Sequence, residues 1–214
     1  MPQIQLTPAE RKVFRADAHH LDPVVMIGGD GLSAAVIKET EAALRASGVP
    51  FVLLRNGWYA ENYAGTAPTA VQHGAVLGSA REGRIAAAAR ADYAAAAAAV
   101  LTGADQGGRI YELAGDTAFT LAEFAAAIAQ HSGKPVAYVD MPQADYAAAL
   151  VKVGLPEGFA ALLADSDAGA ALGGLFDDGK QLSQLIGRST TPIASAARMR
   201  IEMSTKIFEV IIRS

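Results

Sequence analysis

The stretch LLRNGWYAENY, which runs from Leu53 to Tyr63, decides how the rest of this chain is interpreted. Residues 49–54 form an apolar run with the length of a buried strand. Residues 56–65 are polar, aromatic and glycine-containing, and they predict a loop or a broken helix. The stretch therefore places polar and aromatic side chains at the carboxyl end of a predicted strand.

The composition places the chain among globular proteins. It has 214 residues, of which 51% are hydrophobic and 19% are charged. A chain of this length buries roughly 70% of the surface that its unfolded form exposes. The formal net charge of −4 excludes a global positive field that would attract nucleic acid. The absence of cysteine excludes disulfides, thiolate metal sites and a cysteine nucleophile.

Local patterns argue against three further classes. No charge-free run of about 18 apolar residues predicts a membrane span, and the N-terminus lacks the apolar core of a signal peptide. His19 and His20 have no second set of histidines or carboxylates at ligand spacing nearby, so we expect no metal site. We expect a cytoplasmic protein.

The N-terminal part predicts a helix followed by a strand–helix–strand unit. Residues 7–19 begin with Thr-Pro-Ala-Glu, which supplies an N-cap, a proline at the first helical position and a glutamate at the third. The following unit comprises a strand at 24–27, a helix at 34–46 and a strand at 49–54. Its periodicity is compatible with one right-handed βαβ unit.

Shorter elements are expected further along the chain. Asp92 is placed to cap an alanine-rich helix over residues 93–101 and to interact favourably with its dipole. Thr120 is placed to cap a helix that Gly133 ends. Residues 76–78 and 83–85 predict a hairpin-like pair. The remaining expected elements are strands at 109–114 and 135–139, helices at 143–153, 158–165 and 182–186, and a loop at 173–178.

The segment LTPAERKVFRADAHHLDPVVMIGGDGLSAAVIKETEAAL resembles the first half of a CRM-type RNA-binding domain, as in a bacterial ribosome-assembly protein family. The resemblance implies ribosomal RNA or a pre-ribosomal particle as partner. Glycines in the GxxG loop let backbone N–H groups approach phosphate, and a helix N-terminus follows. The implied RNA-binding residues are Arg11, Lys12, Arg15, Gly28, Gly29, Asp30 and Gly31.

An alternative for the same segment stays open. Residues 1–48 contain five Lys and Arg residues and six Asp and Glu residues, a net charge of −1. Phosphate binding normally depends on several basic contacts. The GxxG sequence is then only a strand-to-helix turn.

The later segments resemble the C-terminal half of NAD(P)H:quinone oxidoreductases of the atypical short-chain dehydrogenase, NmrA-like, group. They are KETEAALRASGVPFVLLRNGWYAENY, RADYAAAA, YELAGDTAFTLAEFAAAIAQHSGKPVAY, GLPEGFAALLADSDAGAALGGLFDD and LSQLIGRSTTP. The resemblance implies an α/β fold with an incomplete Rossmann-like parallel sheet and a small α/β substrate-cap region. It also implies NADP(H) as cofactor and a quinone as substrate.

The same resemblance implies which residues form the site. Trp58 and Tyr59 can wall a flat ring by stacking, and Asn56 offers both a donor and an acceptor. The implied cofactor-binding residues are Asn56, Gly57, Trp58, Tyr59, Ala60 and Glu61, and the implied substrate residue is Arg90. Plain structural roles remain as alternatives, with Trp58 and Tyr59 as core aromatics and Arg90 pairing locally beside a helix cap at Asp92.

The glycine-rich fingerprint that holds a dinucleotide is absent from this sequence. Its nearest candidate, Gly28 to Gly31, lacks the GxxGxxG spacing and belongs to the other resemblance. We therefore expect impaired cofactor binding, with an RNA-binding protein and an inactive chimera as alternatives. The expected domains are residues 1–45, 46–197 and an unmatched tail at 198–214. Uncovered strand edges would permit self-association.

Overall fold

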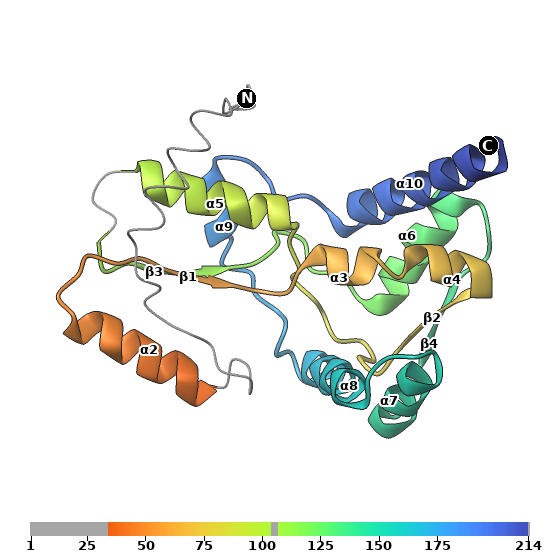
Figure 1. The fold of residues 1–214 in the computed structure, drawn as a ribbon, viewed down its shortest axis with the longest axis horizontal. Helices are drawn as coiled ribbons and strands as arrows, with labels where there is room; N and C mark the ends of the chain where they lie inside the picture. Colours follow the sequence, from red (N-terminus) through yellow and green to blue (C-terminus); the bar gives the residue numbers. More distant parts are fainter. Residues whose placement is uncertain (1–33, 104–106, 214) are drawn as a thin grey trace. The chain divides into compact units, whose positions relative to one another are not determined.

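The computed structural model describes residues 34–103 and 107–213, and the chain divides into two compact units, residues 1–50 and 51–214. In the first unit it describes helix α2 (Ala34–Ala46), with the bounds expected from the sequence. The expected helix at 7–19 and strand at 24–27 lie outside the described residues. The other described helices and all the described strands belong to the second unit (Figure 1).

Two short parallel sheets organise the second unit. Strand β1 (Leu53–Asn56) pairs with β3 (Ile110–Leu113), and their register places Asn56 opposite Leu113. Strand β2 (Ala75–Gly78) pairs with β4 (Ala137–Asp140). Parallel strands require crossover connections, and helices lie between the paired strands in the chain (Figure 1). The α/β class with parallel sheets is confirmed.

The hairpin expected between residues 76–78 and 83–85 is wrong. β2 pairs with the distant strand β4, and Ile85 instead forms an isolated antiparallel bridge with Phe119. The apolar pattern of both segments reflects burial, but it does not indicate which strand each segment pairs with. The strand expected at 49–54 is also displaced, because β1 begins at Leu53 and continues to Asn56.

Helices cover these sheets and supply most of the core. The helix expected at Thr120 is confirmed as α6, whose Thr120 and Glu123 form a reciprocal capping box. The described helices of the second unit are α3 (Ala60–Ala64), α4 (Ala67–His73), α5 (Arg90–Thr102), α6 (Leu121–Ser132), α7 (Gln143–Lys152), α8 (Glu157–Ala171), α9 (Gln181–Ile186) and α10 (Ile193–Arg213).

The prediction that Asp92 caps the alanine-rich helix is wrong. Helix α5 begins at Arg90, its N-cap residue is Ala89, and no side chain of the N-cap residue accepts a hydrogen bond there. Asp92 lies in the first turn, where a negative charge favours the helix dipole. Its side chain is fully buried and binds residues far along the chain.

The segment expected as a separate tail from residue 198 continues a regular helix. Helix α10 begins at Ile193 and packs against α3, α4 and α6 (Figure 1). Ala196 and Ala197 are buried in the same cluster as Phe124 and Ile128 of α6. The start of α10 is therefore part of the core of this unit.

The buried side chains form two clusters. One surrounds Phe124, against which Tyr63 and Phe119 pack with their rings inclined. The other joins Tyr93 of α5, Leu113 of β3 and Leu182 of α9 beneath the first sheet. In residues 34–103 and 107–213, no helix combines the length and the hydropathy of a membrane span.

A buried carboxylate connects α8 to the end of β2. Asp167 is 5% exposed and accepts a hydrogen bond from the Ser79 N–H at 2.9 Å. The position of a Cβ atom on Gly78 would lie 2.7 Å from Asp167 Oδ2, so the carboxylate occupies the space that this glycine leaves. Burial raises the pKa of Asp167 above its ordinary value, the Ser79 hydrogen bond opposes the increase, and the charge of Asp140 adds to it.

This burial predicts how stability depends on pH. A carboxyl whose pKa is raised by folding stabilises the fold at low pH, and this contribution is lost as the pH rises through the folded-state pKa. Asp167→Asn retains an acceptor for the Ser79 N–H without the charge, so its melting temperature relative to the native chain should be higher at pH 8 than at pH 4. Asp165→Asn, at an exposed position of α8, is the control. A difference independent of pH would contradict this account.

Candidate functional site

A cavity of about 250 Å³ lies at the carboxyl ends of β1 and β3. The last residues of β1 and β3 and the residues that follow them line the cavity. Residues of the loop between α8 and α9, called the loop before α9, also line it. The lining residues are Arg55, Asn56, Gly57, Trp58, Ala86, Glu112, Leu113, Ala114, Gly174, Leu175, Phe176 and Asp177.

Close backbone contacts shape this cavity. The Gly57 N–H donates to the Leu113 carbonyl oxygen at 2.8 Å, which extends the β1–β3 pairing by one residue. A Cβ atom on Gly57 would lie 3.0 Å from that oxygen and 3.3 Å from the Tyr93 hydroxyl. A Cβ atom on Gly115 would lie only 2.2 Å from the Ala87 carbonyl oxygen. Gly115 must therefore be glycine for the chain to pass so closely, whereas a methyl group at Gly57 would require its neighbours to give way by a few tenths of an ångström.

The loop before α9 is fixed to the same framework. The Ala86 N–H donates to the Leu175 carbonyl oxygen at 2.8 Å, and the Gly115 N–H donates to the Ala86 carbonyl oxygen at 2.9 Å. Phe176, beside Leu175, is 47% exposed and lines the cavity. An aromatic ring therefore stands at the mouth of the cavity on a loop that backbone hydrogen bonds hold in place.

The rim carries an ion pair between Arg55 and Glu112, which face each other in the β1–β3 register. Both side chains are close to half exposed, so the pair contributes little to stability. Asp177 also lines the cavity. The titratable side chains in the lining thus belong to β1, β3 and the loop before α9.

Three of the predicted site residues meet in this cavity. Asn56 is the exposed last residue of β1, Gly57 follows it, and Trp58 is half-buried with its side chain also packed against the larger core cluster. Trp58 therefore lines the cavity and also packs as a core aromatic, while its role in binding a ring stays a prediction.

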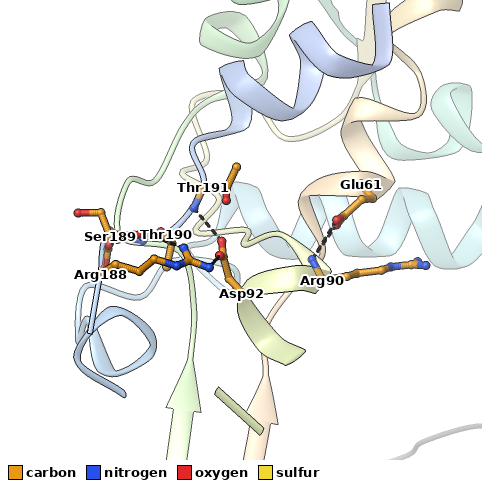
Figure 2. A network of polar contacts seen from close by, with 8 residues as sticks. Glu61, Arg90, Asp92, Arg188, Ser189, Thr190 and Thr191 are labelled. Carbon is orange, nitrogen blue, oxygen red and sulfur yellow. Dashed lines mark hydrogen bonds and ion pairs between the residues drawn. The ribbon is translucent and has the colours of Figure 1, made fainter. Parts of the chain in front are cut away.

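The other predicted residues lie outside the cavity lining, and their binding roles stay predictions. Tyr59 packs edge-on against Tyr93 at 5.4 Å, with the Arg90 guanidinium 4.9 Å from the Tyr59 ring centre. Ala60 is fully buried at the start of α3. Both carboxylate oxygens of Glu61 accept from the Arg90 backbone N–H, at 2.9 and 3.1 Å (Figure 2).

The first turn of α5 also binds a distant segment. Figure 2 shows Asp92 between Arg188 and Thr191. The Thr191 N–H donates to Asp92 Oδ2 at 2.7 Å. Arg188 Nη2 lies 2.7 Å from Asp92 Oδ1, close enough for an ion pair but without the alignment of a hydrogen bond. A carboxylate with no exposed surface thus has a cation and a backbone donor beside it.

Sequence reasoning missed the other half of the cavity, namely Ala86, the end of β3 and the loop at 174–177. The sequence did contain a signal for the end of β3. Residues 49–54 and 109–114 were both expected as strands, and the carboxyl ends of neighbouring parallel strands meet at one edge. The 173–178 loop was expected as a loop, but nothing local connects it to Trp58. The RNA-binding residues predicted between Arg11 and Gly31 lie outside the described residues.

Residues 6–49 match the model of the CRS1 / YhbY (CRM) domain. This match covers the segment for which the RNA-binding resemblance was found and ends just before the second compact unit. The expected CRM-type ancestry of the N-terminal segment is therefore confirmed.

The rest of the chain has relatives of another kind. It is 56% identical over 158 residues to quinone oxidoreductase 2 of Escherichia coli, a match that covers 74% of this chain and 55% of that protein. It is 34% identical over 122 residues to an uncharacterized protein of Haemophilus influenzae, covering 57% of this chain and 70% of that protein. The expected resemblance of this part of the chain to the C-terminal half of the NmrA-like quinone oxidoreductase family is therefore confirmed.

A solved structure of this family has the same fold. The crystal structure of the E. coli NADPH-dependent quinone oxidoreductase QOR2 complexed with NADPH is 54% identical, with a TM-score of 0.74. The match covers 78% of this chain and 59% of that one. This chain thus spans between one half and two thirds of the length of these quinone oxidoreductases.

The tight passage at Gly57 predicts a large effect of one methyl group. Gly57→Ala should lower the free energy of unfolding by about 1–3 kcal/mol, because the Leu113 carbonyl or the Tyr93 ring must move. Gly169→Ala adds the same methyl group inside α8, where no atom lies within 4 Å, and should stabilise by about 0.5–1 kcal/mol. Urea unfolding measures both changes. Equal effects of the two substitutions would refute the steric argument.

Proposed function

We propose that the cavity binds a flat ring, and that this chain takes part in NAD(P)H-dependent quinone reduction. The observation that carries the proposal is the position of Asn56, Gly57 and Trp58 in a cavity at the carboxyl end of parallel strands. Their chain is 56% identical to a quinone oxidoreductase over 158 residues. The ring would be the nicotinamide of NADP(H) or the quinone.

The size of the cavity fits a ring but not a whole dinucleotide. Pockets for drug-sized ligands usually have volumes of about 300–1,000 Å³, and this one has about 250 Å³. Trp58 offers an aromatic surface and the Asn56 amide offers a donor and an acceptor for a ring substituent. A bound nicotinamide would supply the hydride, and the residues of this chain would hold and orient the rings.

The phosphates of the cofactor would need other groups. The glycine-rich fingerprint is absent from the sequence, and the chain spans 55% of the length of quinone oxidoreductase 2. We therefore propose that ring binding persists while affinity for the whole dinucleotide is weakened. The activity of this chain is then impaired relative to that of a complete reductase.

The single tryptophan provides a direct test. Millimolar NADPH or duroquinone should quench the emission of Trp58, because either ring would lie against its indole in the cavity. Asn56→Ala should weaken quenching by about tenfold, the loss expected for a hydrogen bond of about 1.4 kcal/mol. Free N-acetyltryptophanamide corrects for absorption by the ligands, and Asn62→Ala, an exposed asparagine outside the cavity, is the matched control. If the ligands quench Trp58 only as much as they quench N-acetyltryptophanamide at every concentration, the proposed site is wrong.

A second function is favoured by the match of residues 6–49 to the CRM domain. We propose that this segment binds structured RNA through Arg11, Lys12, Arg15 and the loop from Gly28 to Gly31. The glycines permit close approach of backbone N–H groups to phosphate. We also propose that this segment, to about residue 45, acts as a domain separate from the reductase-like part.

RNA binding through these residues predicts a characteristic dependence on salt. Affinity for an RNA hairpin should fall as salt increases, with a slope of about 0.7–0.9 per phosphate contact. Replacing Arg11, Lys12 and Arg15 by alanine should lower both the affinity and this slope. Replacing three exposed basic residues of the second unit, Lys134, Lys152 and Arg200, removes the same charge as a control. Equal losses in the two triple variants would indicate nonspecific attraction and would contradict the proposal.

A further inference from the structure

Glu61 supplies the cap that helix α5 lacks. The N-cap residue of α5, Ala89, has no side-chain oxygen, and the first N–H groups of a helix need acceptors. Both carboxylate oxygens of Glu61 accept from the N–H of Arg90, the first residue of α5 (Figure 2). A carboxylate at this end of a helix also interacts favourably with the helix dipole. The cap thus comes from α3, the helix that directly follows the Trp58 loop.

The start of α5 in turn holds the residues beside the cavity. The Ala88 N–H donates to the Trp58 carbonyl oxygen at 3.1 Å, and the Tyr93 hydroxyl lies 3.3 Å from the same oxygen. Burial raises the pKa of Tyr93, so its hydroxyl keeps its proton and acts as a donor. The Tyr93 ring and the Arg90 guanidinium both contact the ring of Tyr59. Trp58 and Tyr59 are therefore held by the same helical turn that Glu61 caps.

A second set of contacts, made by Asp92, holds the same turn. Asp92 is fully buried and binds Arg188 and the Thr191 N–H (Figure 2). The turn cannot shift away from Glu61 without disturbing these contacts. Capping by Glu61 therefore acts on a turn that Asp92 anchors through a second set of contacts.

We propose that Glu61 is a positioning residue of the ring cavity, acting through the first turn of α5 rather than by touching a ligand. Glu61 does not line the cavity, whereas Trp58, which the capped turn holds through its carbonyl oxygen, does. The ligand effects of this role depend on the proposed ring binding, but the effect on the Trp58 environment does not.

The test compares two caps in the full-length chain. Glu61→Ala should shift the emission maximum of Trp58 and reduce the near-ultraviolet circular dichroism without any ligand. It should also raise the Kd for duroquinone, because Trp58 is then held less firmly against the ligand. Glu61→Gln, which keeps an acceptor for the Arg90 N–H, should restore the spectra and bring the Kd close to the native value.

Glu123→Ala is the matched control, because it removes the corresponding carboxylate from the capping box of α6. It should lower the melting temperature but leave the Trp58 spectrum and the duroquinone Kd unchanged. An unchanged Trp58 spectrum in Glu61→Ala, or the same spectral change in Glu123→Ala, would overturn the positioning role. If the native chain binds neither NADPH nor duroquinone, the proposed function fails, whereas the unliganded spectra still decide the role of Glu61.

Discussion

The parallel pairing of β1 with β3 is the constraint on which the cavity depends. Its register sets Asn56 opposite Leu113, so the residues that follow the two strands emerge at one edge. Strands of four residues in a two-stranded parallel sheet are not stable alone, and such sheets need their faces covered. Tyr93 of α5 and Leu182 of α9 provide this cover, and both are at most 4% exposed. The cavity therefore depends on helices that contribute no side chain to its lining.

The cavity itself is shaped largely by backbone. Gly115 allows main-chain segments to approach more closely than any other residue permits, and Gly57 is tightly enclosed. Among the lining residues, the titratable side chains are Arg55, Glu112 and Asp177, and the first two pair with each other. Most of the lining therefore offers shape rather than titratable groups. The proposed hydride transfer would make that demand, because the cofactor would carry the chemistry and the protein would align the rings.

Local signals allowed most elements to be predicted, and long-range contacts account for the failures. Thr120 and Gly133 bounded α6 correctly, because capping depends on neighbouring residues alone. Asp92 satisfied the same local rule yet binds Thr191, a partner that only the tertiary fold brings near. The ladder partner of β2 was missed for the same reason. In the site, Asn56 to Trp58 were identified through the resemblance to quinone oxidoreductases, whereas Gly174 to Asp177 reach the cavity through the pairing of Leu175 with Ala86.

The size of the cavity also limits what it can distinguish. At about 0.5 kcal/mol for each non-hydrogen atom, a nicotinamide ring with its amide, about nine atoms, gains about 4.5 kcal/mol, which corresponds to a Kd near the millimolar range. A benzoquinone has a similar number of atoms and gains about as much. Contacts with Trp58 and Gly57 therefore could not by themselves give a nicotinamide ring a higher affinity than a quinone ring. Under the proposed function, the order of binding would be set by groups that contact the ribose and phosphates, for which a cavity of about 250 Å³ is too small. The cavity would then supply alignment, and affinity for the dinucleotide would be a separate property of the polypeptide that holds its phosphates.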